Sequence, residues 1–482
     1  MNSTSLRLRP SVTLLHLGSL LILFTGCTVG PKYVRPTIPA PPAYRGPDET
    51  PVSSADQDSL GDQKWAQVFH EAELQDLIHA ALENNYDVRI AARRVLEAQA
   101  QLRITRSQQF PTVAVGGTGI GADLGNSVIG NLGSSGNGLP SGTVVAGTFN
   151  LSAAWTPDFW GLYRRQTEAE RALLLGQVWA QRAVRMTLVE QVTTSYLHLR
   201  SLDEQLAIAK QTFKARQESM ELTRTLESAG SVPLADLRQA EELEYAASVQ
   251  IPQLEQQIQQ EENAIRLLLG KNPGTVDRAD PNALAPVPQD LPVGLPSRLL
   301  ERRPDIGQAE QQLIAANARI GVARAQFFPQ LSITASGGVG GSDFSTIFDP
   351  DSRLIYGIGA LTQPIFEGGK LRGQLQLSEE TKREMVVNYQ QTVAGALRDV
   401  SNALIAVRKQ RTAREQQEKL VAATQDAARL ARKRYNRGAT NYLEVLTTDT
   451  NVFSAQLNLV NLREGEAQSL VELYAALGGG WE

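Results

Sequence analysis

The chain has 482 residues, with 47 lysines and arginines against 51 aspartates and glutamates and a formal net charge of −4, so it carries no basic footprint for nucleic acid. A single cysteine excludes a disulfide framework. Apart from His16, the histidines are His70, His79 and His198, and none of them has the spacing of a metal-binding pair.

The amino terminus predicts a signal peptide over residues 1–26. Basic residues precede an apolar run over residues 12–24, which is too short to span a bilayer and suits a signal-peptide core. Residues 23–27 read Leu-Phe-Thr-Gly-Cys and resemble a bacterial lipobox, with phenylalanine where an aliphatic residue is usual. We therefore expect a diacylglycerol and an N-acyl chain on Cys27; the alternative is an incidental thiol near a conventional cleavage site. Thr28 resembles an outer-membrane sorting signal.

Residues 27–60 are expected to form a lipidated tether. Prolines are frequent from Pro31 to Pro51, and such a segment is not expected to fold on its own. We interpret it as an extended link between the lipid and the body of the protein.

The remainder of the chain is built twice. The repeated positions keep their order and a nearly constant spacing: Asp87 and Asp305, Phe110 and Phe328, Pro157 and Pro364, Gly230 and Gly438, Gly270 and Gly478. Such a pattern indicates a duplicated structural unit. We expect a first repeat over residues 61–270, a linker over 271–296 and a second repeat over 297–482.

Each repeat contains a proline-free stretch that predicts one long helix, over residues 162–229 and 370–437. At about 1.5 Å per residue, each helix would be about 100 Å long, which no compact core can enclose. Each repeat also predicts two shorter helices, 83–109 with 232–269 and 305–327 with 441–477. Their summed lengths approach that of the long helix, so two short helices could stack end to end beside it.

Alternating polar and apolar residues predict one β-hairpin per repeat, over about residues 111–157 and 329–364. The expected strand pairs are 112–120 with 148–155 and 331–335 with 354–361, each strand about long enough to cross a membrane. The intervening residues 121–142 and 341–353 are rich in Gly, Ser, Asn and Asp and predict exposed loops.

Aromatic residues flank the predicted strands. They form either an interfacial girdle or the packing of the helix-to-strand junction. These residues are Phe110, Trp155, Phe159, Trp160, Phe327, Phe328 and Phe366.

Four strands per chain cannot close a barrel, and strands in lipid leave no open edge. If the hairpins cross a membrane, the chain must therefore oligomerise, and two, three or more copies are formally allowed. Mean hydropathy of −0.23 and the lack of a long apolar run after Cys27 exclude membrane-spanning helices.

Three motifs carry a resemblance to a known family. They are Gly30-Pro31-Lys32-Tyr33 with Pro36, Arg434-Tyr435 with Gly438 and residues 442–446, and the terminal residues 475–481. Together they cover both ends of the mature chain, and their combination is specific. The chain resembles the lipoprotein branch of the TolC/OprM family of outer-membrane efflux channels.

The resemblance implies a mixed α and β membrane protein that forms a homotrimer. Three chains would build a twelve-stranded outer-membrane barrel, continued by a long α-helical barrel in the periplasm. The implied partners are outer-membrane lipid, a periplasmic adaptor and an inner-membrane pump, and the implied cargo is drugs, solvents or metal ions. The alternatives are a duct for protein secretion and a lipid-anchored coiled-coil scaffold.

The resemblance also implies a periplasmic gate at the turns near Gly230 and Gly438. By position, Asp236 and Tyr435 match an inter-helix latch pair, and Glu444 matches an acidic ring. The family's latch arginine falls on Thr440 and its second acidic ring falls on Thr447. The candidates to replace them are Arg437 or Arg434 for the arginine and Asp449 for the acid. The alternative for Asp236 and Glu444 is a solvated acid at a helix start.

No motif indicates catalysis. Gly368-Gly369-Lys370 lacks the remainder of a phosphate-binding loop, and no Gly-x-Ser-x-Gly elbow is present. We expect no enzyme activity, no metal site and no cofactor other than the acyl chains.

Overall fold

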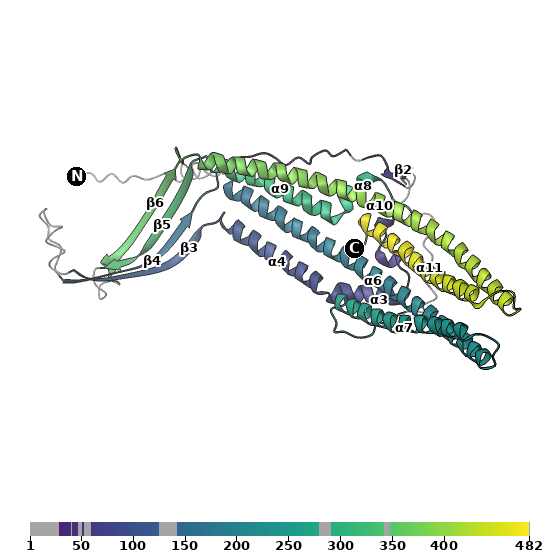
Figure 1. Cartoon of the computed structure of the whole chain (residues 1–482). Coiled ribbons are helices and arrows are strands. Elements are labelled where there is room, and N and C mark those ends of the chain that lie inside the picture. The colour runs from purple at the N-terminus through teal and green to yellow at the C-terminus, as the bar shows by residue number, and fades with distance from the viewer. Residues whose placement is uncertain are drawn as a thin grey trace, which may run out of the picture. The chain divides into compact units, whose positions relative to one another are not determined.

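The computed structural model describes residues 28–39, 41–46, 51–52, 59–124, 142–278, 291–341, 347 and 349–481. The expected signal peptide and Cys27 lie outside these residues, as do parts of the tether and the linker. The chain divides into two compact units, each built from both repeats (Figure 1). The first comprises Met1–Arg35, Glu97–Leu174 and Gln311–Val386, and the second comprises Pro36–Leu96, Leu175–Glu310 and Val387–Glu482.

The first unit contains a four-stranded antiparallel sheet. Its strands are β3 (Thr112–Leu124), β4 (Gly142–Trp155), β5 (Gln330–Gly341) and β6 (Arg353–Thr362). They lie in the order β3-β4-β5-β6, so the hairpins of the two repeats meet where β4 pairs with β5. Strands β3 and β6 are the edges.

The two faces of this sheet differ in polarity. Because side chains alternate along a strand, one face gathers apolar residues from all four strands. Exposed members of this apolar face are Val113, Val115, Phe149, Leu151, Ile333, Ile355 and Leu361. On the other face, the hydroxyls of Thr118 and Thr148 lie 2.6 Å apart, and Asn150 Nδ2 donates to Ser336 Oγ at 3.0 Å. Strand β6 departs from this pattern, because Leu354, Tyr356 and Ile358 are exposed on the second face. The contrast expected of a wall between lipid and water therefore holds for β3, β4 and β5.

The strands extend further than the sequence predicted. The expectation of an exposed loop is wrong for residues 121–124, which belong to β3 and pair with β4. Strand β5 has 12 residues and continues past the expected 331–335 through a run of glycines. A β-ladder needs only backbone groups, so polar and glycine-rich composition did not end these strands. Residues 125–141 lie outside the described part of the chain.

Aromatic residues pack the junction between helices and strands in the first unit. Trp160 stacks on Phe328 with ring centroids 4.7 Å apart, and its Nε1 donates to Pro329 O at 2.8 Å. Phe110 and Phe366 are instead exposed. The two interpretations of the flanking aromatics thus apply to different residues, with packing for the first pair and a candidate girdle for the second.

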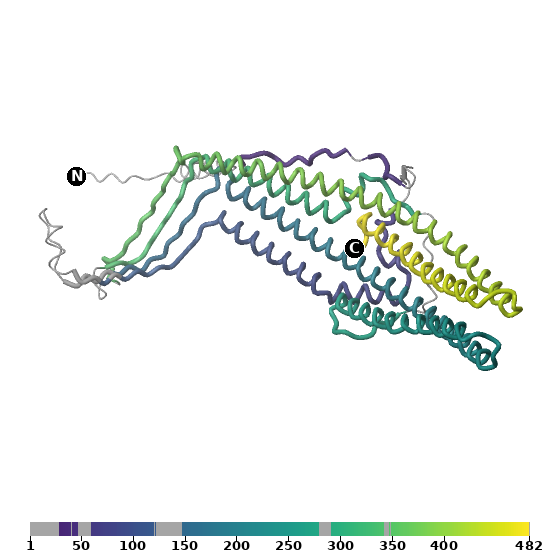
Figure 2. The backbone as a smooth tube through the Cα atoms, viewed as in Figure 1, coloured from purple at the N-terminus to yellow at the C-terminus, as the bar shows by residue number. Residues whose placement is uncertain are grey.

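Helix α6 (Leu162–Ser228) follows the first hairpin, and helix α10 (Lys370–Tyr435) follows the second. They begin at the predicted residues and end one and two residues before the predicted ends. Figure 2 shows the backbone turning back from α6 into α7 (Leu234–Leu268) and from α10 into α11 (Tyr442–Ala476). The other two predicted helices are α4 (Tyr86–Ser107) and α9 (Pro304–Ala325).

In the first repeat, a single side chain joins the two short helices end to end. The buried Asn85 donates from Nδ2 to the Leu268 carbonyl at the end of α7, at 2.9 Å. Its Oδ1 accepts the backbone N–H groups of Asp87 and Val88 at the start of α4. Both helix ends thereby gain a partner for otherwise unsatisfied backbone groups. The predicted helix over 83–109 is wrong at this point, because helix α3 (Ala72–Asn84) ends before Asn85.

In the second repeat, Arg303 is the counterpart of Asn85, just as Asp305 is the counterpart of Asp87. Its guanidinium donates to the Ala476 carbonyl at the end of α11 at 3.2 Å. It also pairs with Asp305, at the start of α9, at 2.6 Å, and with Asp399 of α10 at 3.4 Å. The same junction is therefore neutral in the first repeat and charged in the second.

Small elements complete the structure. They are β1 (Tyr44–Arg45), β2 (Pro51–Val52), α2 (Trp65–Val68), α8 (Pro296–Arg302) and the short 3-10 turns Leu60–Asp62 and Pro350–Ser352. Within the described residues, no helix combines the length and apolar character needed to cross a membrane.

Candidate functional site

The predicted gate residues lie at two helix-hairpin tips of the second unit. We define tip 1 as residues 221–244, between α6 and α7, and tip 2 as the equivalent residues 429–452, between α10 and α11. In tip 1, Gly230 has a φ of 69° and donates to Glu227 O, while the next N–H donates to Leu226 O. Gly438 repeats this geometry in tip 2, again with a φ of 69°. Both turns are Schellman motifs, which favour glycine because φ is positive.

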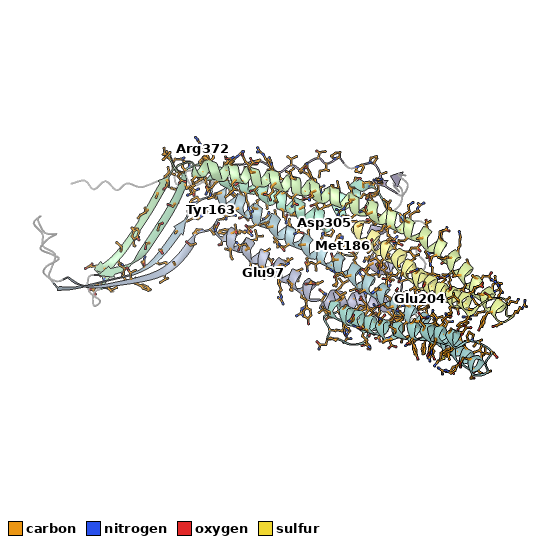
Figure 3. The ribbon with its side chains drawn as sticks, viewed as in Figure 1. Glu97, Tyr163, Met186, Glu204, Asp305 and Arg372 are labelled. Atoms are coloured by element: carbon orange, nitrogen blue, oxygen red, sulfur yellow. The ribbon has the colours of Figure 1, made fainter. Side chains whose placement is uncertain are left out.

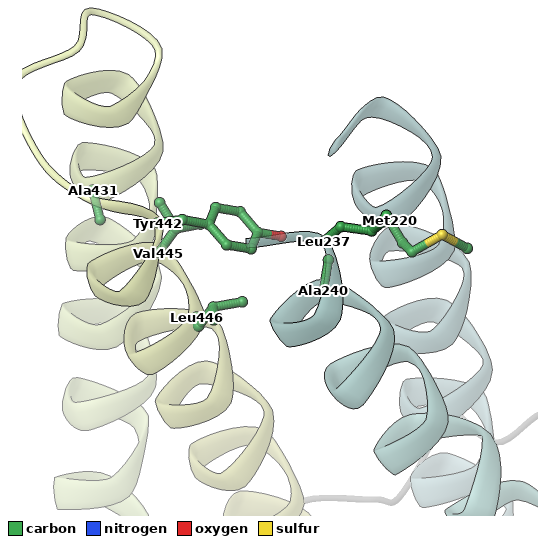
Figure 4. Packing of buried hydrophobic residues seen from close by; sticks show 7 residues of the cluster. All are labelled: Met220, Leu237, Ala240, Ala431, Tyr442, Val445 and Leu446. Carbon is green, nitrogen blue, oxygen red and sulfur yellow. The ribbon is translucent and has the colours of Figure 1, made fainter. Parts of the chain in front are cut away.

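An apolar cluster joins the two tips. Its buried residues come from both hairpins: Met220, Leu237 and Ala240 from the first, and Ala431, Tyr442, Val445 and Leu446 from the second. Figure 4 shows the Tyr442 ring reaching from α11 toward α7. The Tyr442 hydroxyl also lies 3.2 Å from the Ser219 hydroxyl. The tips of one chain are therefore held together mainly by apolar packing.

The predicted latch pair is close in space but not directly bonded. Tyr435 packs against the apolar cluster, with its ring centroid 5.2 Å from that of Tyr442. Burial, together with the nearby charge of Asp236, raises the pKa of the Tyr435 hydroxyl. Tyr435 therefore stays protonated and can donate a hydrogen bond. The structure shows no such bond to Asp236 among the described residues, so the latch remains a prediction.

Both candidate ring acids have arginine partners within the same hairpin. Arg434 Nη1 lies 2.7 Å from Glu444 Oε1, and Thr440 donates to the other oxygen of the same carboxylate. Arg432 Nη2 lies 2.8 Å from Asp449 Oδ2. The structure thus places Arg434, rather than Arg437, beside the acidic position. These pairs are partly exposed, so each contributes less than about 1 kcal/mol.

The Arg432 pair could have been found from the repeat. Arg224 and Glu241 are its counterparts in tip 1, matched in the same register as Gly230 with Gly438, and they lie 3.6 Å apart. The two repeats therefore share one inter-helix ion pair. Residues 429–434 alone do not predict this pair, because a helical run of basic residues indicates exposure but does not reveal partners.

The two tips carry opposite charge. Tip 1 has six acidic and two basic side chains, whereas tip 2 has two acidic and five basic ones. The acidic excess of tip 1 includes Asp236, and the basic excess of tip 2 includes Lys433 and Arg437. Neighbouring tips of opposite sign attract one another, and this attraction weakens as salt is added.

Away from the tips, His198 of α6 and Glu464 of α11 form a hydrogen-bonded pair, with Nδ1 and Oε1 2.8 Å apart. The hydrogen bond that His198 donates to the Glu464 carboxylate raises the pKa of His198 despite partial burial. Burial alone would raise the pKa of the Glu464 carboxyl, but hydrogen bonds from His198, Ser201 and Gln468 lower it below its usual value. The pair is therefore charged on both sides in mildly acidic solution.

This pair gives a pH-dependent prediction. A raised histidine pKa stabilises the fold below about pH 6.5, and the effect is lost as pH rises through the folded-state pKa. Replacing His198 with Gln should lower the free energy of unfolding by about 0.5–1 kcal/mol at pH 6, since a 43% exposed ring is screened by solvent, and by little at pH 9. Unfolding in guanidinium at both pH values measures this. The exposed His70→Gln serves as control, and an equal loss at both pH values would contradict the prediction.

A buried carboxylate was not found from the sequence. Glu466 of α11 is 4% exposed and accepts hydrogen bonds from Arg411 Nε at 2.9 Å and Arg414 Nε at 2.5 Å. The sequence signal for this site is the pair Arg411 and Arg414, which lie one helical turn apart on α10 and face Glu466 of α11.

The chain matches one protein family over most of its length. The model of the family described as "Outer membrane efflux protein" matches residues 77–271 and 295–479. The chain belongs to this family. Its function is therefore that of an outer-membrane efflux protein, and efflux rather than catalysis describes the family.

Relatives and solved structures agree with this membership. The cation efflux system protein CusC of Escherichia coli O6:H1 is 33% identical over 461 residues, covering 96% of this chain and 97% of CusC. The toluene efflux pump outer membrane protein TtgC of Pseudomonas putida is 35% identical over 472 residues, covering 97% and 96%. A crystal structure of CusC superposes with a TM-score of 0.82 at 32% identity, covering 94% of this chain and 100% of that one. The efflux-channel fold is therefore confirmed.

Proposed function

We propose that three copies of this chain assemble into one closed channel, with four strands from each copy in a barrel of twelve. The four-stranded sheet carries this proposal. Its apolar face is exposed in the single chain, and β3 and β6 each pair on one side only within the described residues. Because lipid offers no hydrogen bonds to an open strand edge, β6 of one copy must pair with β3 of the next.

The proposed role is passive conduction of small molecules from the periplasm to the exterior. The relatives are named for different cargoes, cations for CusC and toluene for TtgC, at similar identity to this chain. We therefore propose that an inner-membrane pump selects the cargo and that a periplasmic adaptor connects the pump to tips 1 and 2. Cys27, acylated with a diacylglycerol and an N-acyl chain, would anchor the channel to the outer membrane.

Conductance tests the channel. The purified full-length protein should run as a slow band on a gel unless it is heated, and it should produce discrete current steps in a planar bilayer. Metabolic labelling should place palmitate on the wild type and not on the Cys27→Ala variant. A protein that runs as a monomer without heating and passes no current would overturn the proposal, as expected for a scaffold.

We further propose that Asp236 and Tyr435 restrict the periplasmic end. Replacing them with Ala and Phe should raise single-channel conductance about twofold or more, because a constriction dominates the resistance of a pore. The exposed Arg238→Ala change, close to Asp236 on the same helix and paired with Glu241 of tip 1, is the control. Unchanged conductance in the double variant would remove the latch assignment.

A further inference from the structure

Residues 28–31, directly after the expected lipid-modified cysteine, are docked rather than free. The backbone N–H of Val29 donates to Trp160 O at 3.1 Å. Arg165 of α6 donates from Nε to Val29 O at 3.1 Å and from Nη2 to Gly30 O at 3.3 Å. Asn317 of α9 donates to Pro31 O at 3.0 Å. Four backbone groups of this short segment therefore have partners contributed by both repeats.

The groove that holds residues 28–31 requires glycine on both sides, at Gly30 in the segment and at Gly321 in α9, because the two backbones come very close. A Cβ on Gly321 of α9 would lie 2.8 Å from Val29 O, and a Cβ on Gly30 would lie 2.5 Å from the Gly321 Cα. Either atom would displace the segment. Nearby, buried alanines at positions 169, 172, 315 and 318 bring α6 and α9 together. The close approach of two helices and a third stretch of backbone thus depends on small residues.

The polar groups of the groove are buried and need the segment. Arg165 is 6% exposed and Asn317 is 1% exposed. Apart from the segment, the Arg165 guanidinium contacts the Glu168 carboxylate, at 2.8 Å. Without residues 28–31, the Arg165 and Asn317 donors would lose these carbonyl partners and would need water or other acceptors in their place. The groove is therefore a binding site whose ligand is the chain's own amino-terminal segment.

The second repeat offers a natural comparison. Arg372, the counterpart of Arg165 when Pro157 is matched with Pro364, lies near the start of α10 and is exposed (Figure 3). The counterpart of Gly321 in the first repeat, when Phe110 is matched with Phe328, is Arg103 of α4. A large side chain thus stands where the backbone contact would require a glycine. The duplication has produced one groove of this kind among the described residues, specific for one segment.

We propose that residues 28–31 act as a strap that fixes the lipid anchor to the base of the sheet, through a site formed by Arg165, Asn317 and Gly321. This inference rests on the proposed lipidation of Cys27. Because Cys27 directly precedes Thr28 in the sequence, the acyl chains begin one residue from the docked segment. The lipid anchor is therefore attached directly to the folded protein, which fixes how deep the protein lies in the membrane, instead of through a flexible linker. The strap also ties α6 of one repeat to α9 of the other.

Trypsin provides a direct test on the full-length protein in detergent. Cleavage after the exposed Lys32 separates a lipopeptide of residues 27–32 from the body, and it requires the segment to leave the groove. We expect Arg165→Ala and Gly321→Val to release the lipopeptide of residues 27–32, identified by its mass, about tenfold faster than the wild type. The first variant removes two hydrogen bonds to the segment, and the second places a side chain against Val29 O. The milder Asn317→Ala should accelerate the release less.

The controls are Arg372→Ala and Gly373→Val, which place the same changes on α10, where a Cβ on Gly373 meets no atom within 4 Å. Both should match the wild type. Equal cleavage rates in all variants, with assembly on gels intact, would overturn the strap. A wild type that carries no palmitate would instead overturn the lipidation of Cys27. Docking could still be tested in that case, because the mass of the protein after trypsin treatment shows whether cleavage after Lys32 has occurred.

Discussion

Replacing Arg303 with alanine is expected to lower the free energy of unfolding by about 3 kcal/mol. The side chain is 8% exposed and joins three elements through Asp305, Asp399 and the Ala476 carbonyl. Breaking a buried ion pair costs most when the remaining charge is trapped. Asp305 and Asp399 are about one third exposed and regain some hydration, which places the loss at the lower end of the range for buried pairs.

Arg298→Ala is the matched control for this prediction. Arg298 also precedes α9, but its side chain is 55% exposed and lies 3.6 Å from Asp62, so its loss should cost less than about 1 kcal/mol. Guanidinium unfolding followed by circular dichroism measures both variants. Similar losses for Arg298 and Arg303 would show that the helix junction does not depend on the buried guanidinium.

Gly338→Val should prevent assembly of the channel. A Cβ at this position would lie 2.2 Å from Phe149 O and 2.6 Å from the Asn150 Cα. Both are backbone atoms, so no side-chain rotation relieves the clash, and we expect a cost of about 3 kcal/mol or more at the pairing of β4 with β5. That pairing is the link between the hairpins of the two repeats. The heat-sensitive slow band and the bilayer current should both be lost.

Gly357→Val tests whether valine itself is harmful in this sheet. A Cβ at Gly357 of β6 meets no atom within 4 Å, and valine favours strands. This variant should assemble and conduct like the wild type. If Gly338→Val also conducts normally, the close contact between β4 and β5 is not required, and the proposed wall of paired strands is wrong at this point.

The long elements of the fold could be predicted because local sequence determines them. Two long stretches without proline fix α6 and α10, and the turns at Gly230 and Gly438 follow from a residue that tolerates positive φ. The strand ends could not be predicted in the same way. Backbone pairing with β4 carries β5 through its glycines, so composition alone ended the strand too early.

Contacts between distant residues account for the remaining differences. The break at Asn85 depends on the carbonyl of Leu268, which lies far away in the sequence. The sequence predicted an extended tether after Cys27, and residues 28–31 form neither helix nor strand. Their docking, however, depends on Arg165 and Gly321, remote residues with no local signature.

The candidate gate was only partly predictable. Position in a known motif predicts roles for Asp236, Tyr435 and Glu444, and it leaves Arg434 and Arg437 as equal candidates to replace the latch arginine. Helix geometry separates them, because Arg434 lies on the last turn of α10 and pairs with α11, whereas Arg437 belongs to the turn itself. The charge difference between the tips was readable from the sequence once the repeats were aligned.

The two edge strands of the sheet, β3 and β6, have a genetic consequence. In the proposed trimer, each joint between subunits needs β6 from one molecule and β3 from another, so a normal subunit and a defective subunit with intact edges would join equally well. A cell that makes both normal protein and a variant with sound edges but a blocked interior will incorporate the variant into mixed complexes. Such an allele should be dominant. An allele whose product cannot pair through β3 or β6 should be recessive, because that product does not enter the mixed complexes.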